Sequence, residues 1–146
     1  GVLRQSELSL ARARLSSLVH ELRARQQLIS TGIEMLFRSI MTLPGLREGG
    51  PEVDGTLRKL MERNPFLTTI LVADSEGRVV ATGSDTRDFS IEDRPYFIRA
   101  MDTRSFTCGP VITSRASGLT ALPYSLPSEY GDLIMVGSLI LSRYSD

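Results

Sequence analysis

The sequence predicts an α+β fold, in which a long N-terminal helix and short flanking helices accompany a five-stranded antiparallel sheet. Residues 2–42 contain no proline and one glycine, and they are rich in Leu, Ala, Arg, Glu and Gln, which is the composition of a long helix. Residues 67–142 contain five short apolar runs that are separated mostly by turns. Hairpins connect such runs more readily than parallel βαβ units do.

Apolar residues form a heptad-like stripe along the predicted helix. A leucine or isoleucine recurs every seven residues, at Leu8, Leu15, Leu22, Ile29 and Leu36. The C-terminal half of this helix can lie on its own domain. The N-terminal half reaches further than one small domain can cover, and an exposed row of leucines is a liability. We therefore expect the N-terminal helix to pair with a second copy in a homodimer.

Turn residues and apolar runs set the order of the other elements. A segment rich in glycine and proline ends the helix, so we assign residues 1–44 to a dimerisation helix and residues 45–146 to the domain that follows it, the two forming one structural unit. The predicted elements that follow are, in order, a helix at 53–63, strands at 67–73 and 79–82, a helix at 95–102, and strands at 106–114, 119–126 and 133–142.

Composition and motifs exclude several classes of function. The net charge is zero, so a nucleic-acid partner is not implied. One cysteine and one histidine, Cys108 and His20, make a metal site improbable, and no residue pattern calls for a cofactor. No run of about 18 apolar residues is present to span a membrane. The chain opens within a helix, so we expect it to be a piece of a longer protein.

The segment "IEDRPYF" at residues 91–97 carries the candidate site. A residue before proline is extended, and proline favours the first helical position, so a helix should begin directly after Arg94. The first-turn N–H groups of Tyr96 and Phe97 then lack helical partners. A guanidinium binds a carboxylate with two parallel hydrogen bonds, so we expect a carboxylate pocket here. The polar residues of two later strands that could line the pocket are Thr113, Ser114 and Ser125.

A structural role explains the same residues equally well. Arg94 would then pair with Glu92 or Asp93 on the surface, while Tyr96 and Phe97 pack the helix on the sheet. The spacing of these residues does not decide between the two interpretations.

The long helix, the motif "DRPYF", the earlier turn at Asp74–Gly77 and the strand "GSLILS" together resemble the Cache domains. These are PAS-like extracytoplasmic sensor modules of bacterial histidine kinases, diguanylate cyclases and chemoreceptors. The resemblance covers nearly the whole chain. It implies a PAS-like sheet and a periplasmic or extracellular sensor domain of an inner-membrane protein, with no catalysis of its own. A kinase or cyclase output would lie in the remainder of the protein, and the helix of residues 1–44 would be the signalling helix that the sensor domain of residues 45–146 acts on.

The resemblance also assigns roles to single residues. It implies that Arg94 and Tyr96 hold the carboxylate of a small organic acid and that Phe97 is the second aromatic residue of the site. Family members that bind amino acids carry an acidic residue in the last strand, and residues 133–142 contain none. A ligand without an amino group fits this difference better. The alternatives are a dimerisation and spacer module that binds no ligand and, less favoured, a small enzyme.

Overall fold

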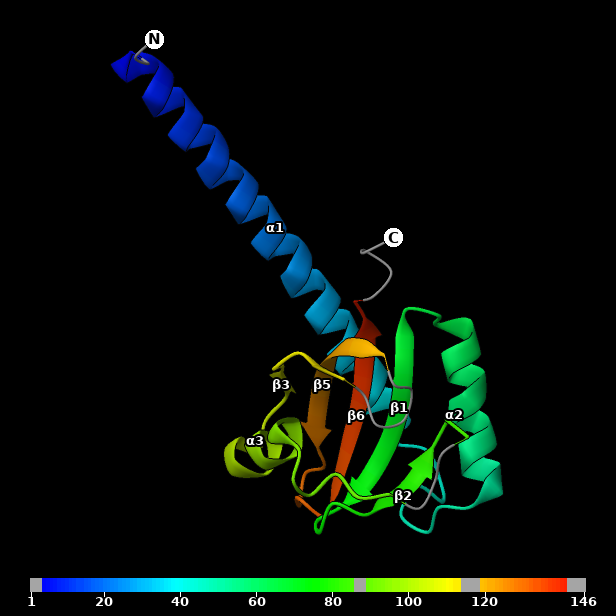
Figure 1. The fold of residues 1–146 in the computed structure, drawn as a ribbon. Coiled ribbons are helices and arrows are strands. Elements are labelled where there is room, and N and C mark those ends of the chain that lie inside the picture. Colours follow the sequence, from blue (N-terminus) through cyan, green and yellow to red (C-terminus); the bar gives the residue numbers. More distant parts are fainter. Residues whose placement is uncertain (1–3, 86–88, 114–118, 142–146) are drawn as a thin grey trace. The chain divides into compact units, whose positions relative to one another are not determined.

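The structure is a computed structural model that describes residues 4–85, 89–113 and 119–141 (Figure 1). Its elements, in chain order, are α1 (Gln5–Ile40), α2 (Pro51–Arg63), β1 (Leu67–Asp74), β2 (Val79–Thr82), α3 (Pro95–Thr103), β3 (Thr107–Cys108), β4 (Ile112–Thr113), β5 (Thr120–Pro127) and β6 (Leu133–Ile140). The α+β class and the order of the helices and strands are confirmed.

The strands form one antiparallel sheet in the order β2-β1-β6-β5-β3, and β4 also pairs with β5. The sheet therefore has six strands where the sequence predicted five. The predicted strand at 106–114 is divided at Gly109 and Pro110, because Gly109 has a φ of 83° and proline has no N–H for the ladder. The two short pieces pair with different parts of β5.

The chain divides into two compact units, residues 1–36 and residues 37–146. In the first unit three of the five stripe residues of α1 are open to solvent, with exposed fractions of 62% for Leu15, 55% for Leu22 and 50% for Ile29, and Leu8 and Leu36 are half-buried. No helix in the described part of the chain is long and apolar enough to cross a membrane.

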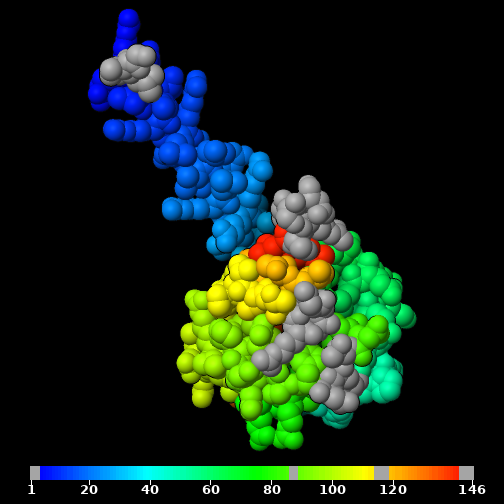
Figure 2. All heavy atoms as spheres, viewed as in Figure 1, coloured from blue at the N-terminus to red at the C-terminus, as the bar shows by residue number. Residues whose placement is uncertain are grey.

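In the second unit, helices cover the sheet, α2 lying against β1 and β2 and α3 against β5 and β3 (Figure 1). In Figure 2 the atoms of α3 and β3, in yellow-green and yellow, form part of the surface viewed, and α3 covers one face of the sheet. A buried apolar cluster joins α3 to this face, and its members from the sheet are Leu71, Ala73, Ile134 and Val136.

Aromatic rings pack on the opposite face of the sheet. The ring of Phe106 stacks on that of Tyr124 at 5.7 Å between centroids and meets that of Phe37 edge-on at 6.3 Å. Phe37 belongs to the last turn of α1 and is fully buried. It lies over Gly137 of β6, where a Cβ atom would be 2.5 Å from the Cζ atom of the ring. Glycine at this position lets the ring reach the sheet.

Two turns at one end of the sheet are held by aspartate. Oδ1 of Asp74 accepts hydrogen bonds from the N–H groups of Glu76 (2.9 Å) and Arg78 (3.0 Å). In the turn between β5 and β6, Ser128 donates to Asp132 at 2.7 Å, and this hydrogen bond, with the nearby charge of Arg47, lowers the pKa of the Asp132 carboxyl. The carboxylate of Asp74 thus accepts backbone N–H groups of its turn, and that of Asp132 accepts a side-chain hydroxyl.

Candidate functional site

Arg94 stands at the junction between an extended segment and α3. Its φ and ψ are −81° and 137°, and the helix begins at Pro95, as the residue before a proline predicts. The backbone N–H of Arg94 donates to the carbonyl of Ile91 at 2.9 Å. The N–H of Ile91 in turn donates to the carbonyl of Gly77 at 2.8 Å, so the turn after β1 positions the segment that carries Arg94.

The guanidinium of Arg94 reaches from α3 to a neighbouring strand. One terminal nitrogen donates to the backbone carbonyl of Thr113 in β4 at 2.8 Å, and the Cζ atom lies 5.8 Å from the centroid of the Tyr96 ring. The Nε atom is buried and has no hydrogen-bond partner among the described residues. A buried N–H of a charged group without a partner is costly, so an acceptor that reached this nitrogen would relieve that cost.

The first turn of α3 differs from the prediction at one residue. The N–H of Phe97 was expected to lack a helical partner, but it donates to the carbonyl of Arg94 at 3.1 Å. This carbonyl also accepts from Ile98 at 3.1 Å. Such shared bonds tighten the first turn of many helices, so the amide of Phe97 is not free for an anion.

The two aromatic residues of the motif are both buried. Tyr96 and Phe97 belong to the cluster that packs α3 on the sheet, together with Ile91 and Ala100. Tyr96 has a second role, because its ring lies beside the guanidinium of Arg94 and favours one orientation of that cation. For Phe97 the observed contacts are those of a core residue.

Of the remaining predicted residues, Thr113 lies on β4 and Ser125 on β5. Thr113 is exposed, and its carbonyl meets Arg94, whereas Ser114 lies outside the described residues. Ser125 is fully buried on the face that α3 covers, opposite Val136 of β6. The structure thus brings Arg94, Tyr96 and Thr113 together, and it places Ser125 further along the strand.

Thr107 is a polar residue of this face that sequence reasoning missed. It lies opposite Ser125 in the pairing of β3 with β5. The hydroxyl oxygens of both residues are buried and, within the described part of the chain, have no hydrogen-bond partner. The pairing of a two-residue strand leaves no periodic pattern, so the sequence carried no signal for Thr107 beyond its place in an apolar run.

The described residues provide no metal site. Nowhere in residues 4–85, 89–113 and 119–141 do three or more His, Cys, Asp or Glu side chains come together in a way that could hold a metal ion. The chemistry of the described site therefore rests on one guanidinium, hydroxyl groups and aromatic rings.

No protein-family model matches the chain, and no curated protein matches it in sequence. Solved structures do match. The extracellular domain of rpHK1S-Z16, described as a histidine kinase, superposes with a TM-score of 0.70 at 23% identity over 94% of this chain and 61% of that one. The ligand-binding domain of Mlp24 with asparagine gives a TM-score of 0.65 at 14% identity over 98% of this chain and 62% of that one.

A third match is the ligand-binding domain of the Pseudomonas aeruginosa amino-acid chemoreceptor PctC in complex with GABA. Its TM-score is 0.59 at 16% identity, over 78% of this chain and 54% of that one. The chain shares the fold of these sensor domains. It spans 54% to 62% of the length of these three sensor domains. The sensor fold expected from the resemblance is confirmed.

Proposed function

We propose that this chain is the extracytoplasmic sensing domain of a membrane-bound signalling receptor and that it binds a small organic carboxylate at Arg94. The observation that carries the proposal is the state of the guanidinium, whose Nε is buried without a partner among the described residues while one terminal nitrogen is fixed by Thr113. The sensor fold supports it, because the matched domains of Mlp24 and PctC are ligand-binding domains.

The geometry of Arg94 suits a carboxylate. A guanidinium offers its donors in a rigid fork, so a carboxylate can accept from Nε and from a terminal nitrogen at once. The hydrogen bond to Thr113 and the ring of Tyr96 hold the fork in one orientation before any ligand arrives. A binding group that is already ordered loses less conformational entropy on association.

The proposed ligand lacks an amino group. The matched domains contain asparagine and GABA, which both carry an amine. In this chain β6 runs from Leu133 to Ile140 without an acidic residue. An ammonium bound beside this strand would lose its hydration and gain no counter-charge from it.

Arg94→Ala tests the site. A thermal-shift screen with acetate, pyruvate, lactate, malate, succinate and citrate should find at least one acid that raises the unfolding temperature. For that acid the substitution should weaken binding about ten- to a hundred-fold in calorimetric titration, because a hydrogen-bonded charge is lost. The matched control is Arg99→Ala, which removes a comparable bond from the same helix to the carbonyl of Cys108 at 3.2 Å.

Two outcomes would contradict the carboxylate site. If Arg99→Ala abolished binding as fully as Arg94→Ala, the effect would come from a loosened α3 and not from a lost ligand contact. If no acid of the panel bound, the chain would be better explained as a spacer module that binds no ligand.

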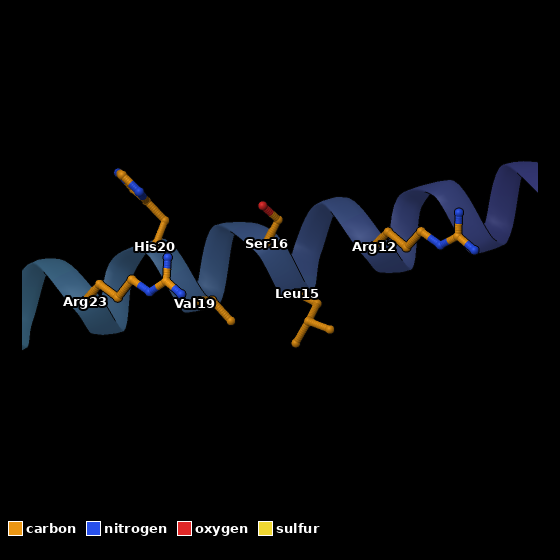
Figure 3. A pocket seen from close by; sticks show the side chains of 6 residues that line it. All are labelled: Arg12, Leu15, Ser16, Val19, His20 and Arg23. Atoms are coloured by element: carbon orange, nitrogen blue, oxygen red, sulfur yellow. The ribbon is translucent and has the colours of Figure 1, made fainter.

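We further propose that the exposed stripe of α1 pairs with that of a second copy. Leu15, Leu22 and Ile29 follow the seven-residue spacing that two supercoiled helices require. Figure 3 shows Leu15 and Val19 pointing to one side of the helix and Ser16 and His20 to the other. Arg12 and Arg23 complete the shallow depression that these side chains line. Pairing would carry the signal toward a kinase or cyclase output in the rest of the receptor.

A further inference from the structure

The exposed stripe of α1 contains one charged residue at a position where the spacing calls for an apolar one. Two paired helices touch through residues that alternate in steps of three and four along each chain. Between Leu8 and Ile29, steps of three from the leucines that recur every seven residues add Ala11, Leu18 and Arg25. We call these three residues and the four of the row, Leu8, Leu15, Leu22 and Ile29, the seam. Arg25 is the only member of the seam that carries a charge.

The charge of Arg25 is balanced by a residue of the same helix. A terminal nitrogen of its guanidinium donates to Oε1 of Glu21, one turn earlier, at 2.8 Å. Both side chains are exposed, and an exposed ion pair between helical residues four apart contributes little to stability. Leucine has nearly the same helix propensity as arginine. The single helix therefore gives no reason for arginine at this point of the seam.

The residues that border the seam favour a parallel arrangement of two copies. In a parallel pair in register, the residue before each leucine of the row lies beside the residue five positions later in the second copy. The three contacts are Glu7 with Arg12, Arg14 with Val19, and Glu21 with Gln26. The first joins opposite charges, and none joins like charges, so the borders of the seam are complementary in this arrangement.

The same arrangement brings the two Arg25 side chains into one layer of the seam. Each would be accompanied by the Glu21 of its own chain, so the layer would hold two positive and two negative charges. A guanidinium has five N–H donors in a planar fork, enough for its own carboxylate and for that of the second copy.

Other arrangements offer Arg25 no second carboxylate. In an antiparallel pair it would face a leucine or isoleucine of the row, and in a parallel pair displaced by seven residues it would face Leu18. A charge placed against an apolar side chain loses hydration and gains nothing in return.

We propose that Arg25 and Glu21 of two copies form a single polar layer in the seam and that this layer fixes a parallel pairing in register. The inference rests on the proposed pairing of α1 with a second copy. A polar residue at one seam position is a means by which paired helices select one register, and it lowers their affinity. The seam thus gives up some affinity for a defined alignment of the two copies.

Sedimentation equilibrium of the whole chain tests the energetic part. Arg25→Leu should tighten the dimer at least about ten-fold, because apolar contact replaces two desolvated charges. Arg23→Leu is the matched control, since it removes the same charge from a residue outside the seam and should leave the dissociation constant within about two-fold. Glu21→Gln should weaken the dimer about ten-fold, because the two guanidiniums would then face each other without carboxylates.

Disulfide trapping tests the register. In a chain with Cys108→Ser, the substitution Ala11→Cys puts one thiol in the seam, and mild oxidation should link two copies, because equal seam positions touch in a parallel pair in register. Ser9→Cys lies outside the seam and should stay unlinked. Adding Arg25→Leu to the Ala11→Cys chain should lower the linked fraction about two-fold or more, although that dimer is tighter, because other alignments become populated.

Failure of this inference is separable from failure of the pairing. If the unsubstituted protein is a monomer, the pairing itself is wrong and the polar layer falls with it. If the protein is a dimer but Ala11→Cys does not link, the parallel register is overturned and the pairing remains. The polar layer is also overturned if Arg25→Leu tightens the dimer no more than Arg23→Leu does, if Glu21→Gln leaves the affinity unchanged, or if the linked fraction does not fall.

Discussion

Gly77 holds the segment before Arg94 against the end of β1. Its φ is 84°, and a Cβ atom there would lie 2.6 Å from the backbone nitrogen of Glu92. Its carbonyl accepts the N–H of Ile91, three residues before Arg94. Glycine is therefore required at the end of the turn Asp74–Gly77, because no other residue allows both the left-handed backbone and the close approach to Glu92. This requirement concerns the site, since Gly77 holds the segment that leads to Arg94.

Gly77→Ala should lower the free energy of unfolding by about 2–4 kcal/mol, since a left-handed non-glycine residue costs roughly 1–2 kcal/mol and the clash with Glu92 adds to it. Urea denaturation measures the change. Gly55→Ala is the control, because Gly55 lies within α2 and a Cβ atom there would have no neighbour within 4 Å, so alanine should stabilise by about 0.5–1 kcal/mol. Equal effects of the two substitutions would show that the turn tolerates a side chain.

Local rules predicted the part of the site that is local. The extended Arg94 and the helix start at Pro95 follow from the order of two residues, and the structure agrees. The hydrogen bond from Arg94 to the carbonyl of Thr113 spans 19 residues, and the pair Thr107 and Ser125 spans 18. Contacts at such separations depend on strand register, which the sequence of one strand does not determine.

At the scale of elements, a glycine of the central strand β6 lets the end of α1 pack closely on the sheet. Gly137 pairs with Tyr124 of β5 and Ile70 of β1, and the ring of Phe37 fills the space above it. The last turn of α1 is thereby seated on a central strand. A side chain at this point of the strand would hold the helix end away from the sheet.

Gly137→Ala should destabilise the domain by about 1–3 kcal/mol, the usual cost of inserting a methyl group into a packed core. Phe37→Leu in the same chain should recover part of that loss, because a shorter side chain leaves room for the new methyl group. Thermal and urea unfolding of the two single variants and the double variant give the coupling between the sites. Strict additivity of the two effects would mean that Phe37 does not rest on Gly137.

The helices were easier to predict than the strands of the β3–β4 region. The lack of proline and the apolar spacing predicted α1 to within three residues at each end, since the structure has Gln5–Ile40 where residues 2–42 were expected. The run at 106–114 resembles one strand because its residues on either side of Gly109 and Pro110 favour strands. The division at Gly109 and Pro110 follows from backbone geometry at these two residues. A scale of strand preference that is averaged over the whole run does not detect it.

At the scale of the whole molecule, the proposed pairing of α1 with a second copy can be tested by measuring the mass of the protein in solution. Leu15→Glu together with Leu22→Glu should convert the proposed dimer to a monomer, because each copy would place two charges in the apolar seam. Light scattering after size exclusion gives the mass directly. Leu10→Glu is the matched control, since Leu10 is 53% exposed but lies outside the seven-residue stripe. A monomer before any substitution, at concentrations up to about a millimolar, would contradict the pairing.

The sensor fold could be predicted from the sequence, whereas the ligand could not be named from it. The fold depends on the order of elements and on the motif around Arg94, and both are visible in the chain. Ligand choice depends on which hydroxyls and charges share a face. Thr69, Thr107, Ser125 and Ser138 come from four strands. Only the register of these strands shows that the four side chains lie on the same face.

The strands β3 and β5 present consecutive residues to opposite sides of the sheet. The side chains of Thr107 and Ser125 lie on the face that α3 covers, whereas their neighbours Phe106 and Tyr124 stack on the other face, where Phe106 meets Phe37. We therefore propose that a ligand which shifted β3 or β5 from the α3 face would also shift the rings that meet the last turn of α1. The signal would then cross only the thickness of a single sheet.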